Sequence, residues 1–195
     1  EVMLAYAMNG ADLPMLNGYP VRLVVPGYYG TYWVKHLADI QVLDKEFDGF
    51  WMQKAYRIPD NDCACTPVGK APDKTRPIGR YNVRSFITSL ADGARVPKGA
   101  PVRVRGIAFD GGRGIRDVQF SADGGKTWRA ATLGQDLGRY SFREWHAEFT
   151  PAQAGAYQLK ARATNMAGDT QPLEPLWNPS GYMRNVVETV RIDAA

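Results

Sequence analysis

The sequence predicts a mostly β protein, and two observations carry that prediction. Short strand-like segments, most of them alternating apolar and polar residues, recur at intervals of roughly 10 residues in the C-terminal part, at 102–109, 115–120, 127–131, 140–149 and 157–163. Turn signals separate them, including the Gly-rich run 111–114 and the Asp-Gly-Gly triplet 123–125, where glycine accepts a positive φ without steric cost. Short strands of this kind are typical of an antiparallel, Ig-like β-sandwich without the Cys…Trp…Cys spacing of antibody domains.

The N-terminal part has a different organisation. Residues 20–25 and 40–43 are β-rich, and they flank an aromatic, glycine-punctuated segment at 28–37. Residues 59–80 contain four prolines, which lack a backbone donor, so a linker without regular structure is expected there. We therefore predict two domains, residues 1–80 including this linker and residues 81–195.

Composition excludes several classes of function. The 195 residues carry a formal net charge of +4, with 45% hydrophobic and 23% charged residues, as in a soluble globular protein. Basic residues are scattered, so nucleic-acid binding is not expected, and no apolar run approaches the roughly 20 residues of a membrane span. The basic surplus is either an ordinary solvated surface or an attraction for small anions or an acidic partner. Because the chain enters an apolar segment directly at its first residues, it resembles the interior of a longer protein.

The two cysteines are Cys63 and Cys65. One intervening residue rarely allows a mutual disulfide, and Cys-x-Cys alone is not a zinc site, so two loop thiols are expected. The absence of Cys-x-x-Cys-His predicts no covalent c-type haem on this chain. No residues with metal-ligand spacing are found, and of the two histidines only His36, next to a turn, is a candidate pocket residue.

One tyrosine is a candidate catalytic residue. Tyr56 lies in the run 49–60 between Lys54 and Arg57, in a stretch without a helical or strand period. Its hydroxyl is a neutral donor, and neighbouring positive charge would ease its transient ionisation. This arrangement suits an anionic substrate, although most tyrosines beside basic residues are ordinary surface or half-buried ones.

Several motifs, in order, resemble the sulfite oxidase family. Residues 4–10, 18–27 and 34–37 are similar to the late part of its molybdenum domain. Residues 121–128 resemble the DGG-x-TW hairpin of its C-terminal, Ig-like dimerisation domain, and residues 176–182 resemble its near-terminal WN segment. The match extends through nearly the whole chain and is most similar to bacterial, cytochrome-linked sulfite dehydrogenases.

The resemblance implies a function and its partners. It implies an α+β remnant of a molybdopterin-binding domain followed by the sandwich, and oxidation of sulfite to sulfate at molybdenum held by a molybdopterin dithiolene and a cysteine. It further implies electron transfer to a c-type cytochrome or haem subunit, a possible homodimer and a periplasmic location. The metal-ligating cysteine belongs to an earlier part of the family's sequence, so this chain alone is expected to be inactive.

The resemblance also implies roles for particular residues. The family's active-site tyrosine aligns with Tyr56, which would bond to an oxo group or to bound sulfite. The pterin-binding arginine aligns with Arg22, whose guanidinium suits a phosphate. Trp33, Val34 and Lys35 align with a segment that contacts the cofactor.

Three departures from the family pattern limit these assignments. Asn17 replaces a cofactor-contacting histidine of the animal enzymes, so it can bond to the cofactor but cannot carry charge. Ser180 replaces a substrate-pocket arginine, and Arg184 is a candidate replacement, the alternative being a surface or interface arginine. Cys63 and Cys65 follow the tyrosine and do not correspond to the metal ligand.

Two other functions remain open from the sequence. One is a related molybdenum enzyme acting on another sulfur compound, such as sulfane sulfur or a sulfoxide. The other is a non-catalytic assembly module, in which the sandwich mediates protein association and residues 1–58 are a remnant. The molybdenum and pterin content of the full-length protein would separate an enzyme from a module.

Overall fold

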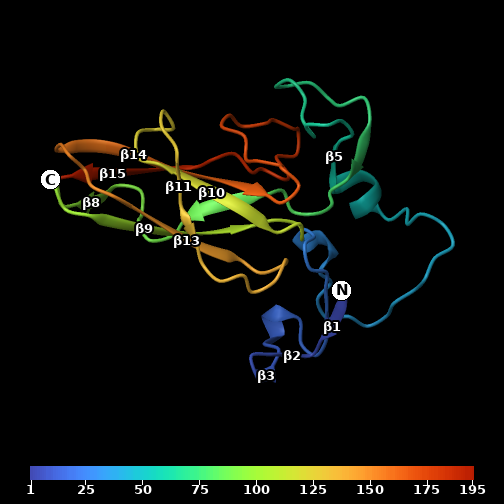
Figure 1. Cartoon of the computed structure of the whole chain (residues 1–195). Coiled ribbons are helices and arrows are strands. Elements are labelled where there is room, and N and C mark those ends of the chain that lie inside the picture. Colours follow the sequence, from blue (N-terminus) through green and yellow to red (C-terminus); the bar gives the residue numbers. More distant parts are fainter. The chain divides into compact units, whose positions relative to one another are not determined.

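The computed structural model describes all of residues 1–195 and is mostly β, which confirms the predicted fold class (Figure 1). The chain divides into two compact units. Unit 1 comprises Glu1–Tyr81 and Leu176–Met183, and unit 2 comprises Asn82–Pro175 and Arg184–Ala195. The segment 176–183 thus belongs to unit 1, although the sequence predicted it to be part of the sandwich domain.

Unit 2 contains two β-sheets, whose strands are mostly antiparallel. The first has the order β11 (Arg129–Ala130), β10 (Ile115–Ser121), β14 (Gly155–Asn165), β15 (Thr189–Ala194), β8 (Ala94–Val96). The second has the order β12 (Thr132–Leu133), β13 (Arg143–Phe149), β9 (Val102–Phe109), β7 (Arg84–Ile87). Every neighbouring pair is antiparallel except β15 and β8, which run parallel.

Alternation along these strands builds one common core. In β9, Val102 and Val104 are buried while Arg103 between them is exposed, so one face of the strand packs inward. Trp145 joins them from β13 of the same sheet, and Phe120 and Leu159 join them from the other sheet. Because side chains of both sheets fill one buried cluster, unit 2 is a β-sandwich.

A tryptophan and a glycine interlock at the centre of the four-stranded sheet. Trp145 is 2% exposed, and its indole N–H donates to the hydroxyl of buried Ser85 over 2.9 Å. A Cβ atom at Gly106 would lie 2.3 Å from the Trp145 ring and 2.1 Å from the carbonyl oxygen of Phe86. Glycine at position 106 therefore makes room for the ring, and Ser85 satisfies its only polar atom.

We predict that Ser85→Ala lowers the free energy of unfolding by about 1–3 kcal/mol, because the buried indole N–H loses its acceptor. The change should be seen as a lower midpoint in urea, followed by tryptophan fluorescence. Ser141→Ala is the matched control, since Ser141 is exposed in the same unit, and it should change stability by less than about 0.5 kcal/mol. Equal midpoints for the two variants would contradict this role of Ser85.

The predicted hairpin after β10 is present, and the carboxylate of Asp123 organises it. Its Oδ1 accepts backbone N–H groups of Lys126 and Thr127 at 3.0 Å, and its Oδ2 accepts the Thr127 hydroxyl at 2.5 Å. Ser121 donates its hydroxyl to the same carboxylate at 2.7 Å and accepts the N–H of Gly125, whose φ is +95°. The hydrogen bonds from Thr127 and then Ser121 lower the pKa of Asp123 well below its usual range.

The stability that this turn contributes should therefore depend on pH. Because the pKa of Asp123 is lower in the folded protein than the roughly 3.9 of an unfolded chain, its stabilisation is complete above about pH 4 and is lost as the pH falls further. Asp123→Asn should lower the free energy of unfolding at pH 7, and the difference from the wild type should shrink below about pH 4. Urea titrations across this range would measure it. Asp193→Asn, at an exposed position of β15, is the matched control and should change the free energy of unfolding at pH 7 by less than about 0.5 kcal/mol.

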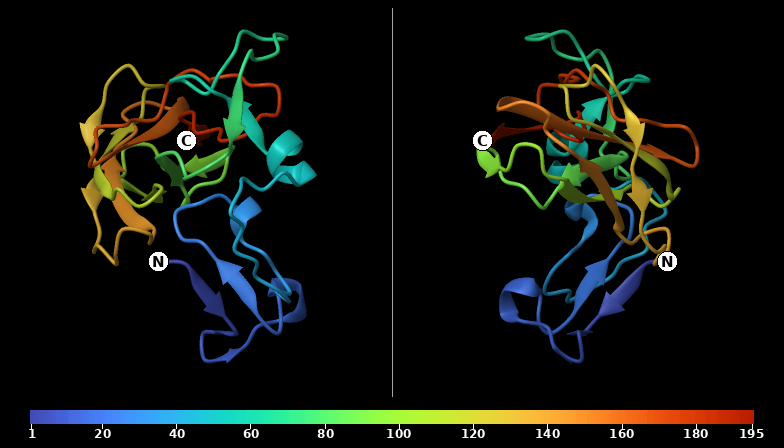
Figure 2. Two further views of the ribbon diagram at one scale, coloured as in Figure 1. Left: turned by 90° about the vertical axis from the view of Figure 1, so that its right-hand side faces the viewer. Right: turned by 60° about the vertical axis from the view of Figure 1, so that its left-hand side comes forward.

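Unit 1 has three small two-stranded sheets and three short helices. Figure 2 shows β1 and β4 side by side as blue arrows. The strand pairs are β1 (Met3–Ala5) with β4 (Arg22–Val24), β2 (Ala7–Met8) with β3 (Ala11–Asp12), and β5 (Arg57–Pro59) with β6 (Thr75–Pro77). The helices are the 3-10 turns η1 (Met15–Asn17) and η2 (Gly30–Tyr32) and the π-turn η3 (Trp51–Ala55). None of the helices in the structure has the length and apolar character needed to cross a membrane.

Two local predictions for unit 1 were wrong. The expected strand at 40–43 has no regular structure, and Ile40 and Val42 are 61% and 97% exposed because no neighbouring strand pairs with them. The expected linker 59–80 is irregular in its middle, but its ends contribute to the β5–β6 ladder. Pro59 and Pro77 fit this ladder because they occupy its two ends, where a missing N–H removes no central hydrogen bond.

Candidate functional site

The predicted cofactor residues gather around a tight turn between η1 and β4. Gly18 in this turn has φ +110°, and a Cβ atom there would lie 3.0 Å from Cβ of Arg22 and 3.2 Å from Cβ of Lys35. The turn therefore packs directly on both basic residues and requires glycine for its backbone conformation. Asn17 ends η1 immediately before this turn, so its exposed side chain lies beside the same pair.

Backbone hydrogen bonds hold the segment after η2 along β4. The N–H of Leu23 donates to the carbonyl of Val34 at 2.8 Å, and the N–H of Leu37 donates to that of Val21 at 2.8 Å. His36, between these contacts, has φ +51°, and its Nδ1 lies 2.7 Å from the carbonyl oxygen of Tyr19. The histidine thus braces the turn, and Val34 and Lys35 are placed next to the strand that begins with Arg22.

The side chains of this cluster leave several donors available. Arg22 donates through Nη1 to the carbonyl of Asn17 at 2.9 Å, and its Cζ lies 5.6 Å from the Trp33 ring centroid. Lys35 donates through Nζ to the carbonyl of Leu16 at 2.7 Å. The guanidinium stacked near an indole face keeps its planar fork in one orientation, with Nη2 without a partner, and this is the geometry that suits a phosphate oxygen.

Two buried polar atoms in unit 1 have no hydrogen-bond partner, and both lie in this region: Nε of Arg22 and Oγ1 of Thr31. Arginine Nε atoms are also unpaired in unit 2, so the hydroxyl of Thr31 in η2 is the more specific signal. Buried polar groups are ordinarily paired, so the unpaired hydroxyl of Thr31, two residues before Trp33, is a group that a bound cofactor would satisfy. The residues present therefore fit a molybdopterin phosphate.

Tyr56 directly follows the π-turn η3 and has aromatic neighbours. Its N–H closes the turn on the carbonyl of Trp51 at 2.7 Å, and the two rings stack with centroids 5.3 Å apart. The ring of Tyr182 meets it edge-on at 6.1 Å. The hydroxyl of half-buried Tyr56 makes no hydrogen bond within the chain, so it is a neutral donor available to a ligand.

Buried Ile78 connects Tyr56 to the cofactor cluster through its backbone. Its N–H donates to the carbonyl of Tyr56 at 3.0 Å, while its own carbonyl accepts the hydroxyl of Tyr32 from η2. Burial, and then the neighbouring Tyr28, raise the pKa of Tyr32, which keeps this hydroxyl protonated and able to donate. One residue thus links the loop that contains Trp33 to the turn that presents the tyrosine.

The basic neighbours of Tyr56 have different surroundings. Arg57 donates Nε to Oγ1 of Thr75 at 2.7 Å, Nη2 to the carbonyl of Thr75 at 2.6 Å, and Nη1 to that of Met52 at 2.9 Å. Its guanidinium therefore joins β5, β6 and η3, and it has few donors left for an anion. Lys54 is exposed in the last turn of η3.

The WN segment contributes Tyr182, a neighbour of Tyr56 that was not predicted from the sequence. Asn178 closes a turn by donating to the carbonyl of Tyr182 at 2.9 Å and accepting the N–H of that residue at 3.2 Å. The carbonyl of Trp177 accepts the N–H of Thr66 at 2.9 Å, which attaches the segment to unit 1. Tyr182 is thereby held against Tyr56, and the motif carried no signal for this contact because the two positions are distant in sequence.

Arg184, the candidate substrate residue, is ion-paired within unit 2. Its Nη1 donates to Oε1 of Glu188 at 2.7 Å, and the same oxygen accepts Nη2 of Arg84 at 2.7 Å. Partial burial raises the pKa of Glu188, but the hydrogen bonds from Arg184 and Arg84 hold it below its usual value. The structure thus supplies Arg184 with a carboxylate partner, and its role toward substrate stays a prediction.

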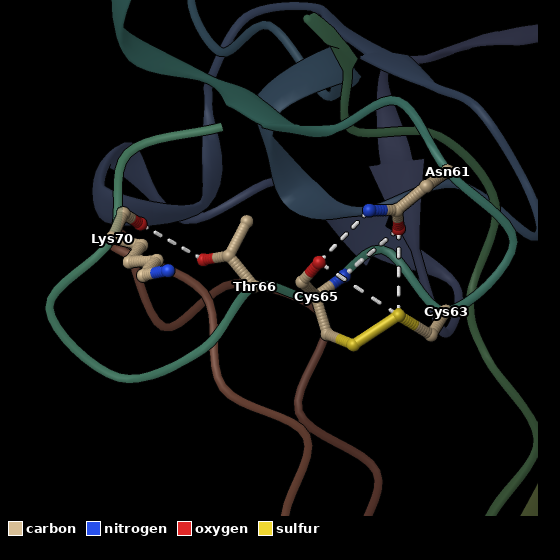
Figure 3. The surroundings of a disulfide bond; sticks show 5 residues. All are labelled: Asn61, Cys63, Cys65, Thr66 and Lys70. Carbon is tan, nitrogen blue, oxygen red and sulfur yellow. Dashed lines mark hydrogen bonds between the residues drawn. A yellow bond between two sulfur atoms is a disulfide. The ribbon is translucent and has the colours of Figure 1, made fainter. Parts of the chain in front are cut away.

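The prediction of two free loop thiols was wrong, because Cys63 and Cys65 form a disulfide (Figure 3). A left-handed Ala64 between them, with φ +49°, turns the two side chains to the same side. Sequence spacing alone could not reveal this, since positive φ is uncommon for alanine. No group of three or more His, Cys, Asp or Glu side chains is arranged to hold a metal ion.

Each of the two units is matched by a known protein family. Residues 1–51 match the family described as oxidoreductase molybdopterin binding domain, and residues 75–195 match the Mo-co oxidoreductase dimerisation domain. The first match contains the residues around the turn at Gly18, which we call the Arg22 cluster: Asn17, Gly18, Arg22, Trp33, Val34 and Lys35. The second covers the β-sandwich together with β6.

Comparison with individual proteins gives the same result. The chain is 34% identical over 203 residues to mitochondrial sulfite oxidase of Homo sapiens, covering 98% of this chain and 36% of that protein. It is 34% identical to sulfite oxidase of Arabidopsis thaliana, covering 94% and 49%. The solved sulfane dehydrogenase SoxCD from Paracoccus pantotrophus matches with a TM-score of 0.82 and 28% identity, over 97% of this chain and 48% of that one.

The two family matches place the chain in a family of molybdenum-cofactor oxidoreductases. The chain belongs to the sulfite oxidase family and corresponds to its C-terminal portion. It spans about a third to a half of the length of these relatives.

The cofactor cluster can be tested through Arg22. In the full-length protein, Arg22→Gln should weaken cofactor binding by roughly ten- to a hundredfold, because a charge-assisted bond to phosphate is lost. Molybdenum and pterin per polypeptide would be measured after dialysis. Arg76→Gln is the matched control, because Arg76 makes only an exposed contact of 3.6 Å to Asp60. Full occupancy in a folded Arg22→Gln protein would contradict the assignment.

Proposed function

We propose that this chain is the C-terminal part of a molybdenum enzyme that oxidises sulfite to sulfate and passes the electrons to a c-type cytochrome. The observation that carries the proposal is the unpaired hydroxyl of Tyr56, linked through Ile78 to the loop of the Arg22 cluster. A neutral donor in the same unit as a cationic cluster that fits a polyanionic cofactor is suited to a small oxyanion substrate. The family membership and the sulfite oxidases among the relatives support the same reaction.

The chain's own residues would position the reactants. When bound, the molybdenum cofactor supplies oxygen-atom transfer to sulfur and takes up two electrons. Arg22, with Lys35 beside it, would hold the cofactor's phosphate, and Trp33 would keep the guanidinium in its plane. Tyr56 would donate its hydroxyl proton in a hydrogen bond to an oxygen of the reacting group as negative charge develops there.

The aromatic neighbours would keep that donor in place. Trp51 stacks on one side of Tyr56, and Tyr182 contacts it edge-on. A ring held on two sides loses little conformational freedom when a ligand binds, so its hydrogen bond is pre-organised. This arrangement aids catalysis without adding a charge that would bind sulfate, the product, as tightly as sulfite.

A second substrate class has its own supporting observation. The SoxCD structure shares the fold over 97% of this chain, and its name gives sulfane sulfur as the group that it oxidises. Reduction of cytochrome c by the full-length enzyme should be followed with sulfite and, separately, with a persulfide. Turnover with sulfite alone supports the proposal, and turnover with the persulfide alone would replace it with the second reading.

Partners and location are part of the same proposal. The dimerisation-domain match to residues 75–195 supports a homodimer. A c-type cytochrome or separate haem subunit would accept the electrons, and a periplasmic location would bring the enzyme together with it.

We predict that Tyr56→Phe in the full-length enzyme lowers kcat by roughly a hundred- to a thousandfold, as expected for loss of one donor to developing charge. Molybdenum content should be unchanged, because the ring contacts remain. Tyr6→Phe is the control, since Tyr6 is 72% exposed. An unchanged kcat for Tyr56→Phe would exclude the assigned role.

A further inference from the structure

The Cys63–Cys65 disulfide lies in the loop that joins β5 to β6. The β ladder closes this loop, and the N–H of Asp60 adds a further bond to the carbonyl of Lys74 at 3.0 Å. Cys63 is exposed and Cys65 is half-buried, so Cys63 is the more accessible residue of the pair. The reaction proposed above uses neither residue.

The loop conformation does not depend on the sulfur–sulfur bond alone. Oδ1 of Asn61 accepts the N–H of Cys65 at 3.2 Å, and its Nδ2 donates to the carbonyl of Cys65 at 2.9 Å (Figure 3). The N–H of Ala64 donates to the carbonyl of Asn61 at 3.1 Å. Thr66 continues the arrangement with a hydroxyl bond to the carbonyl of Lys70 at 3.0 Å. Breaking the disulfide would therefore leave the two cysteines close together.

The two sulfurs also differ in their chemical surroundings. Sγ of Cys63 lies 3.4 Å from Oδ1 of Asn61 and 3.7 Å from the carbonyl oxygen of Cys65. In the disulfide this sulfur has no proton to donate, whereas in the reduced form its thiol can donate to either oxygen. Two facing oxygens disfavour a thiolate at Cys63, so negative charge after cleavage is better placed on Cys65.

We propose that Cys63–Cys65 is a thiol–disulfide exchange site that reacts with small sulfur nucleophiles, with Cys63 as the sulfur attacked. The exposure of Cys63 lets a nucleophile reach it. The two oxygens near its sulfur favour cleavage that leaves the negative charge on Cys65. The hydrogen bonds of Asn61 keep the two cysteines close together, so the disulfide can form again. This proposal is independent of the reaction proposed for Tyr56.

The exchange balances with a thiolate or with sulfite. A thiolate attacks Sγ of Cys63, the sulfur–sulfur bond breaks, and a mixed disulfide forms on Cys63 while Cys65 leaves as a thiolate. A second thiolate attacks the outer sulfur, releasing a small disulfide and the Cys63 thiolate. Both cysteines then take up protons, so two electrons pass from two thiols to the protein. Sulfite in place of the first thiolate leaves an S-sulfonate on Cys63 and a thiolate on Cys65.

Mass spectrometry of the native full-length protein tests the proposal. The protein is incubated with reduced glutathione or, separately, with sulfite, quenched with acid, alkylated and cut with trypsin, which releases both cysteines in peptide 58–70. We expect a glutathionyl group in the first arm and a sulfonate in the second, each on Cys63, with Cys65 alkylated. The two masses distinguish the nucleophiles.

Other outcomes overturn the proposal. If both adducts form only after denaturation, the disulfide is structural and inaccessible. If the adduct lies on Cys65, the assigned direction of attack is wrong. If the isolated protein contains two free thiols that oxidised glutathione does not convert to the disulfide, the pair is not an exchange site.

Substitution of Asn61 tests the reversibility. After reduction and removal of the reductant, Asn61→Ala should re-form the disulfide in a glutathione redox buffer roughly tenfold more slowly, because two hydrogen bonds that fix the turn are lost. Val68→Ala is the matched control, since Val68 is 79% exposed in the same loop, and its rate should equal that of the wild type. Circular dichroism verifies folding of each variant. Equal rates for both variants would contradict the role of Asn61.

Discussion

Unit 1 depends on one short segment, Ile78 to Tyr81, whose backbone joins pieces of chain that share no sheet. Ile78 is 3% exposed and bonds to Tyr56 through its N–H and to Tyr32 through its carbonyl. Gly79 then accepts the N–H of Tyr29 at 3.2 Å, and the N–H of Tyr81 donates to Gly27 at 2.8 Å. Two-stranded sheets this small are marginal by themselves, so these bonds, with the burial of Ile78, hold the two parts of the candidate site in one unit.

The arginines of this protein differ in how many hydrogen-bond donors they leave available to an anion. The basic surplus suggested attraction of an anion, yet Arg57 braces a hairpin and Arg184 shares Glu188 with Arg84. Arg22, with a buried Nε and one free Nη group, retains donors for an anionic group. This division suits the proposed enzyme, whose cofactor would need a strong cationic contact and whose anionic substrate would leave as a more highly oxidised anion.

The sandwich was predictable in detail because its strands alternate. Residues 102–109, with one buried face, became β9 as expected, and the Asp123 turn formed where Asp-Gly-Gly indicated it. The strand predicted at residues 40–43 did not form, because a β-rich segment needs a neighbouring strand to pair with and this segment has none. The disulfide was missed because the spacing of two cysteines does not show the left-handed backbone that Ala64 adopts between them.

The sequence by itself determined the β class, the family and the identity of the candidate residues, since alternation, turn chemistry and ordered motifs are local properties. Tertiary structure alone decided which of those residues meet. It brought Lys35 against Gly18, placed Tyr182 beside Tyr56, and joined Cys63 to Cys65. Such contacts depend on backbone angles at single residues and on hydrogen bonds between distant segments. Neither of these produces a periodic pattern of residues that could be recognised in the sequence.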